Sequence, residues 1–291
     1  MRRIRFSLSV LATLAFIASA CGGSKVTPLA MVQAASTATA QAKTASISMA
    51  MTGGQGALAN TNFAGAFDFD KHLMSLTIDA SKLGIPGGSG SFDAVMDFAS
   101  SPVEYVKVPG LEQEFNGKHW MKVDLGAAVA SVCPGTDFGS LFKMQSGDPT
   151  SGLAILSSAN KVSVVGPETL HNLKTTHYAA IVDVTKVAAS ASPEVRATMQ
   201  KLASYYTNPI RAVDVWLDGQ GRAVRVKQSV DMSQIKLPDC LTKSAAAASN
   251  PFKGSFTMTM DMFDFGKAVN IVVPPDTDVA DLQQLVKSLR G

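Results

Sequence analysis

The sequence predicts an α+β protein built mainly from an antiparallel sheet, and three observations predict it. Apolar residues recur at every second position along several segments, which is the pattern of strands with one buried and one solvated face. Residues 212–230 join two such segments through a turn containing Gly219 and Gly221, which supply the positive φ that a hairpin needs. Helical spacing or capping residues mark only three longer segments, at 29–45, 193–207 and 278–289, so we expect roughly ten strands and three main helices.

The first twenty residues have the layout of a secretory signal peptide. Arg2, Arg3 and Arg5 form a positive segment, and the apolar run at 8–17 is too short to span a bilayer comfortably. We therefore expect residues 1–20 to be removed on export.

The small residues at 18–20 are followed at once by Cys21, an arrangement that resembles the lipobox of bacterial lipoproteins. This resemblance implies that Cys21 becomes the mature N-terminus and carries acyl chains, palmitate among them. Residues 21–28 would then be a lipidated tether at the extracytoplasmic face of the plasma membrane. Stable anchoring takes more than one acyl chain, since each buried CH₂ contributes about 0.8 kcal/mol. The alternative is a plain secreted protein with an incidental cysteine.

The charge of the chain argues against a nucleic-acid partner. The 26 Lys+Arg and 23 Asp+Glu give a formal net charge of +3, but the signal peptide holds three arginines and no acid, so the mature chain is neutral. Its length is enough to bury one sizeable core, and we expect a single domain over 29–291. No second stretch is long and apolar enough for a transmembrane helix.

The first half of the domain is expected to hold one helix followed by strands. Residues 29–45 are rich in alanine, so we expect a helix with one face formed by Met31, Ala34, Ala35, Ala38 and Ala42. Alternation then predicts strands that bury Ile47, Met49 and Met51; Phe63, Gly65, Phe67 and Phe69; Met74, Leu76 and Ile78; and Phe92, Ala94, Met96 and Phe98. Two shorter strands are expected at 103–106 and 119–123.

The second half combines an insertion with further strands and helices. Residues 125–160 interrupt the alternation, with a short helix expected at 150–159. Strands are expected at 162–165 and at 174–184, where Tyr178 and Val182 would face inward.

The last strand is expected at 255–265, with Met258 and Met260 on its inner side. Asp278 stands where it could cap a C-terminal helix, which we expect within 276–290.

Two cysteines remain once Cys21 is assigned to the lipid anchor. We predict that Cys133 and Cys240 form a disulfide, because the compartment outside the plasma membrane favours oxidation and leftover cysteines of exported chains usually pair. The alternative is two buried free thiols.

Catalytic and metal-binding signatures do not occur in the sequence. No C-x-x-C, P-loop or G-x-S-x-G motif is found, and no metal-site spacing links His72, His119, His171 and His177. We therefore expect no enzyme activity, no catalytic residue, no metal and no cofactor.

Methionine is concentrated on the predicted strands. Its flexible, polarizable side chain suits surfaces that accept varied apolar partners, but it also fills ordinary cores. Both interpretations, an adaptable pocket and a filled core, remain open at this point for Met49, Met51, Met74, Met96, Met121, Met258, Met260 and Met262.

The chain resembles the actinobacterial LppX/LprG-type lipoproteins, which are related in fold to LolA. The features that carry the resemblance are the lipobox, KTASISMAMT after the first helix, GPETLHNLKTTHYAAIVDV, the hairpin VDVWLDGQGRAVRV and the ending MFDFGKAVNIVVPP. The similarity runs over most of residues 29–275. The 125–160 insertion and the expected C-terminal helix depart from the family pattern.

The resemblance implies a strongly curved antiparallel sheet that forms an incompletely closed half barrel with helices packed on its concave face. It further implies an apolar cavity that binds acyl chains of a lipid or glycolipid, which the protein carries or presents in the cell envelope. We expect a membrane transporter as a further partner, and a monomer. The cavity is expected to be lined by Met49, Met51, Phe67, Met74, Leu76, Met96, Phe98, Met121, Tyr178, Val182, Met258 and Met260.

The alternative function is a structural or regulatory envelope lipoprotein that binds a protein partner. Its own helices would fill the inner face of the sheet and leave no room for a ligand. The packing of the apolar face distinguishes the two.

Overall fold

The computed structural model of the chain confirms the α+β class. The residues that it describes are 26–55, 60–79, 91–99, 103–107, 115–124, 126–127, 131, 133, 153–183, 185–186, 193–236, 239–242 and 253–282. The predicted signal peptide, Cys21 and most of the 125–160 insertion lie outside the described residues.

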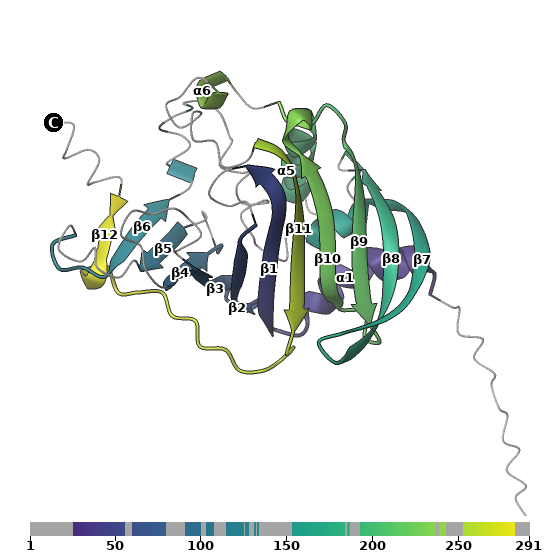
Figure 1. Ribbon diagram of the computed structural model, residues 1–291, viewed down its shortest axis with the longest axis horizontal. Helices are drawn as coiled ribbons and strands as arrows, with labels where there is room; N and C mark the ends of the chain where they lie inside the picture. Colours follow the sequence, from purple (N-terminus) through teal and green to yellow (C-terminus); the bar gives the residue numbers. More distant parts are fainter. Residues whose placement is uncertain are drawn as a thin grey trace, which may run out of the picture.

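One twelve-stranded sheet forms the body of the protein, in the order β12-β6-β5-β4-β3-β2-β1-β11-β10-β9-β8-β7 (Figure 1). Neighbouring strands are antiparallel except β12 and β6, which run parallel. The outermost strands, β12 and β7, do not pair within the described part, so the curved sheet stays open as expected. The strands are β1 (Thr44–Gln55), β2 (Asn62–Asp68), β3 (Leu73–Asp79), β4 (Ser91–Asp97), β5 (Val103–Lys107), β6 (Trp120–Asp124), β7 (Ala159–Leu170), β8 (Leu173–Asp183), β9 (Ile210–Asp218), β10 (Ala223–Asp231), β11 (Lys253–Phe263) and β12 (Val279–Asp281).

The helical elements are few and mostly short. They are α1 (Pro28–Ala40), α5 (Pro193–Ser204), α6 (Asp239–Thr242) and the 3₁₀ helices η2 (Ile155–Ser158), η3 (Met232–Gln234) and η5 (Asp276–Asp278). The helix expected from Pro193 is present as α5. The helix expected over 150–159 is wrong at its end, because its last turn is the 3₁₀ helix η2 and Ala159 already pairs with Val182 as the first residue of β7.

Helix α1 covers the inner face of one half of the sheet. The Thr27 hydroxyl accepts a hydrogen bond from Ala30 N, and Pro28 occupies the first turn, where it costs no backbone hydrogen bond. The helix packs on η2 and on β7–β10, behind which it lies in Figure 1. Its buried face differs from the predicted one, since it consists of Val32, Ala35 and Thr39, whereas Ala34 is exposed.

Thr39 explains why the helix is rotated in this way. Its hydroxyl donates to Ala35 O at 2.7 Å and accepts from Ala223 N at 2.9 Å, and the side chain is fully buried. The bond to Ala223 satisfies a backbone donor at the start of β10. This polar contact between helix and sheet outweighs the small-residue stripe on which the prediction rested.

The hairpin β9–β10 forms as predicted, with one difference in its turn. Gly221 has φ +78°, but Gly219 adopts no positive φ. The Asp218 carboxylate shapes the turn instead, because it accepts hydrogen bonds from Gln220 N and Arg222 N, each at 2.9 Å.

The outer face of the other half of the sheet is covered by the chain itself. Residues 264–278 run from β11 along the sheet to β12 (Figure 1). Ile271 and Val279 bury the outward-facing side chains of Leu73, Val95 and Tyr105. Consequently this half of the sheet has apolar residues on both faces.

The predicted C-terminal helix is wrong where the structure describes it, since Val279–Asp281 is strand β12 beside β6. Asp278 does not cap a helix: its carboxylate accepts from His119 N at 3.0 Å and lies 2.6 Å from His119 Nδ1. These bonds hold the pKa of Asp278 below its ordinary value. The rest of the predicted helix, from residue 283, lies outside the described residues.

Candidate functional site

The inner face of β1–β6 is an almost continuous apolar surface. Strand register aligns its side chains in rows that cross the sheet. One row consists of Met260, Met49, Phe63, Ile78 and Phe92, and the next of Met262, Ile47, Gly65, Leu76, Ala94, Val106 and Met121. An apolar surface of this width must be covered by the chain, by a partner or by a ligand.

The twelve residues predicted to line a cavity divide evenly between core and partly accessible surface. Six are buried: Phe67, Met74, Leu76, Tyr178, Val182 and Met260. The other six are half-buried: Met49, Met51, Met96, Phe98, Met121 and Met258.

The buried residues on β8 lie beneath α1. The Tyr178 hydroxyl donates to the sulfur of Met31 on that helix at 3.7 Å, and Val182 has no exposed surface. Helix α1 and η2 therefore fill this half of the inner face. Tyr178 and Val182 belong to the core rather than to an accessible lining.

The half-buried residues lie on the half of the sheet that α1 leaves free. We name them the open patch: Met49, Met51, Phe63, Met96, Phe98, Val106, Met121 and Met258. Phe98 contacts the core through Phe67, with ring centroids 6.3 Å apart. The patch combines unbranched methionines with two phenylalanines, a composition that adapts to apolar guests of varied shape.

One residue of this face is not apolar. Glu104 on β5 stands opposite Met96 of β4 and Val123 of β6. Burial raises the pKa of its carboxyl above the ordinary value.

The sequence did not predict Glu104 as a site residue, because the VEYVK segment has the pattern of a strand with one buried and one solvated face. In such a strand the acid faces water, but here Tyr105 faces the outer cluster under Ile271, so Glu104 faces inward. The sequence did offer one signal for the inward orientation of Glu104. Val106 lies two residues further along the strand, so it shares the face of Glu104, and it packs against the inner core.

The outer face of β8–β11 carries a network of paired ionisable side chains. Arg225 forms a bidentate ion pair with the Asp261 carboxylate, with Nε donating to Oδ1 at 2.5 Å and Nη2 to Oδ2 at 2.6 Å. His171 Nε2 lies 2.7 Å from Oδ2 of the same carboxylate. Although burial opposes ionisation of Asp261, these two partners hold its pKa below the ordinary value. His177 pairs with Asp214 at 2.8 Å in the same way.

Stacking completes this outer network. The His177 ring stacks on Trp216 at 4.0 Å, and the His171 ring stacks on Phe263 at 4.2 Å. Histidines that are paired and stacked in this manner stabilise the sheet, and no group of three or more metal-ligating residues occurs in the described part of the chain.

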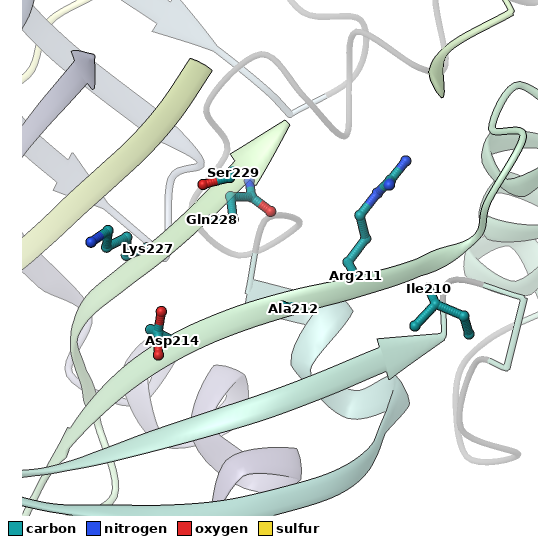
Figure 2. Close-up of a pocket in the computed structure, with 7 residues that line it drawn as sticks. All are labelled: Ile210, Arg211, Ala212, Asp214, Lys227, Gln228 and Ser229. Carbon is teal, nitrogen blue, oxygen red and sulfur yellow. The ribbon is translucent and has the colours of Figure 1, made fainter. Parts of the chain in front are cut away.

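A small polar pocket of about 190 Å³ opens between β9 and β10 where their pairing ends (Figure 2). It is lined by Ile210, Arg211, Ala212, Asp214, Lys227, Gln228 and Ser229. Figure 2 shows Arg211 extending from β9, and its guanidinium lies over the Tyr206 ring at 4.0 Å. Pockets for drug-sized ligands measure about 300–1,000 Å³, so this one is too small for lipid chains.

Cys133 and Cys240 form the predicted disulfide, with Cα atoms 5.4 Å apart. It connects segments separated by 107 residues. Among the described helices, none is both long and apolar enough to cross a membrane.

Comparison with known sequences gives one distant relative. No protein-family model matches the chain. An uncharacterized 31.2 kDa protein from the rplA–rplJ intergenic region of Streptomyces griseus is 24% identical over 180 residues, which cover 59% of this chain. The match spans half the length of that relative.

Comparison with solved structures gives lipoproteins of the kind that the motifs resemble. Lipoprotein LppX of Mycobacterium tuberculosis is similar at a TM-score of 0.46 and 12% identity, over 84% of this chain and 97% of that one. LprF of Mycobacterium bovis is similar at a TM-score of 0.42 and 10% identity, over 85% of this chain and 96% of that one. A LolA superfamily protein of Nitrosomonas europaea is similar at a TM-score of 0.26 and 8% identity, over 87% of this chain and 96% of that one.

Proposed function

We propose that this chain is an envelope lipoprotein that binds the acyl chains of a lipid or glycolipid on the open patch and carries or presents that lipid. Acylated Cys21 anchors it at the extracytoplasmic face of the plasma membrane. It acts as a monomer, hands its cargo to or from a membrane transporter, and catalyses no covalent step.

The open patch is the observation that carries the proposal. Its members remain half-buried although they adjoin fully buried core residues such as Phe67 and Met74. A lipid chain that covers the patch gains about 0.8 kcal/mol for each methylene group removed from water. Ten buried methylenes would contribute about 8 kcal/mol before the cost of ordering the chain, which is sufficient for stable binding.

The sequence of the N-terminus supports the anchor. Residues 18–21 resemble a lipobox and are followed by a short polar stretch, which supports a position of the domain next to a membrane, where its cargo would be found. The disulfide fits the same compartment, because structural disulfides persist outside the cytoplasm.

Lipid that copurifies with the protein tests the proposal. The full chain is expressed in an actinobacterial host, purified and extracted with organic solvent, and the extract is analysed by mass spectrometry. We expect lipid in near-stoichiometric amount beyond the acyl groups attached to Cys21. No additional lipid in the extract would contradict the proposal.

A matched pair of variants locates the binding surface. Met51 lies in the patch, and its neighbour Thr52 is exposed on the opposite face of β1. We expect Met51→Lys to remove most of the copurified lipid, because a charge then lies among apolar groups. Thr52→Lys should leave the lipid content unchanged.

A second candidate function is a scaffold that binds a protein partner. The burial of Tyr178 and Val182 favours it, because α1 covers the strands on which these two predicted cavity residues lie. In this case the Met51→Lys and Thr52→Lys variants would both purify without lipid, as would the wild type.

A further inference from the structure

Glu104 is the single ionisable residue among the inner-face positions of β1–β6 that the structure describes. The other charged residues of β4, β5 and β6 occupy the opposite face, at positions that alternate with the apolar rows: Asp93, Asp97, Lys107, Lys122 and Asp124. The remaining inward positions that the structure describes on these strands, up to Gly53 on β1, carry apolar side chains or glycine.

The surroundings of Glu104 offer it no partner. Its neighbours across the sheet are Met96 and Val123, and Val106 follows on its own strand. Among the described residues nothing donates a hydrogen bond to its carboxylate or forms an ion pair with it, and burial raises its pKa.

An unpartnered carboxyl at such a place weakens the fold. Glu104 is half-buried, and removing even part of a carboxylate from water without a compensating hydrogen bond lowers the stability of the folded state. Leucine or methionine at this position would continue the apolar row at no such cost. The carboxyl is therefore not explained by stability, and polar groups without a partner often mark functional sites.

A bound amphiphile would supply the missing partner. Met96, Val106 and Met121 are members of the open patch and surround Glu104 on β4, β5 and β6. A lipid whose acyl chains cover these residues brings its polar group to the same surface. In that apolar setting a hydrogen bond to the carboxyl is stronger than in water.

We propose that Glu104 accepts a hydrogen bond from a hydroxyl or ammonium group of the lipid bound on the open patch, and so selects lipids whose polar group is a donor. This inference rests on the proposed function and specifies the chemistry of its cargo. The shared feature is an O–H or N–H donor close to the acyl chains.

Two matched lipid pairs test the selection, with the full acylated chain in mild detergent and a fluorescent fatty acid as the displaced probe. Dioctanoylglycerol carries a hydroxyl donor, and its 3-acetyl ester does not. Dioctanoyl phosphatidylethanolamine carries an ammonium donor, whereas the corresponding phosphatidylcholine has none. We expect the wild type to prefer the donor of at least one pair by about tenfold, and the pair that shows it identifies the donor as hydroxyl or ammonium.

Substitutions assign the preference to Glu104. Glu104→Leu should abolish it while the donor-free lipids bind at least as well as to the wild type. Glu104→Gln should keep a hydroxyl preference, since its amide oxygen still accepts, and weaken an ammonium preference. Lys107→Leu, on the outer side of the same strand, should leave the preference intact.

The outcomes separate this inference from the proposed function. If all four lipids bind within twofold of one another, or if Glu104→Leu retains the preference, the role of Glu104 is refuted and lipid binding stands. If the wild type binds none of the four lipids and no fatty acid, the proposed function fails as well.

Discussion

Replacing Glu104 by glutamine is predicted to stabilise the protein at neutral pH. The carboxyl is partly buried between Met96 and Val123 with no partner among the described residues, and burial raises its pKa above the ordinary 4.5. The folded state therefore holds the Glu104 proton more tightly than the unfolded state does. Stability is lost as the pH rises from 4.5 through the raised pKa, and the full cost is present above that pKa.

The magnitude follows from the partial burial. The gain is limited to the cost of burying the negative charge, because the glutamine amide is also polar and also lacks a partner. For a half-buried group this cost lies at the lower end of the about 1–3 kcal/mol found for unsatisfied buried polar groups. We expect Glu104→Gln to raise the free energy of unfolding by about 1 kcal/mol at pH 7, or the melting temperature by about 2–4 °C.

Unfolding in urea or by heat, repeated between pH 3.5 and 8, measures this difference. The two proteins should be equally stable below pH 4.5, and the variant should gain as the pH rises. Asp70→Asn serves as control, because Asp70 is exposed in a surface pair with Lys43 at 3.9 Å, and such pairs contribute little. A variant that is less stable than the wild type at pH 7, or a gain that does not depend on pH, would refute the reasoning.

Three further changes probe the scaffold. Gly65→Ala should lower the free energy of unfolding by more than about 3 kcal/mol, since its Cβ would lie 1.8 Å from Ser75 O; urea titration shows this, and near-neutral stability would contradict the close approach. Replacing both Cys133 and Cys240 by serine should lower the free energy of unfolding by about 3–5 kcal/mol in the chain-entropy model. The reduced wild type is the control, and the variant should have the same melting temperature. Asp261→Asn should destabilise the protein at pH 7 by about 2–4 kcal/mol, because it removes the ion pair with Arg225. Below the lowered pKa of Asp261 the wild-type carboxyl is also neutral, so the two proteins should be equally stable there. A loss of stability that persists unchanged in acid would argue against the ion pair.

Strands were the most predictable feature of this protein because their alternation is local. Met49, Met74 and Met260 were assigned to the inner face from spacing alone, and the register places them there. The hairpin around Gly221 was equally predictable, since turn chemistry depends on neighbouring residues.

The errors concern contacts between segments that are distant in the sequence. Asp278 looked like a helix cap, but it binds His119, 159 residues earlier in the chain, and β12 forms instead. The orientation of α1 is likewise set by the bond from Thr39 to Ala223, which no helical spacing reveals.

In the candidate site, too, local patterns were predictable and contacts between distant segments were not. Alternation identified most members of the open patch, but it could not separate them from Tyr178 and Val182, because that depends on where α1 lies. The inward orientation of Glu104 depends on the cover that residues 264–278 place over Tyr105. In the local sequence, Val106 is the one sign of this orientation, because it shares the face of Glu104.

Photo-crosslinking with a fatty acid that carries a diazirine in its acyl chain tests the central claim most directly. After irradiation of the full chain, mass spectrometry of peptides should find adducts on open-patch residues, in particular Met49, Met51, Met96 and Met121, and competition with unlabelled lipid should remove them. Adducts confined to the outer face, for example at the exposed Thr52 and Thr77, or no competable adduct at all, would contradict lipid binding on the inner face of the sheet.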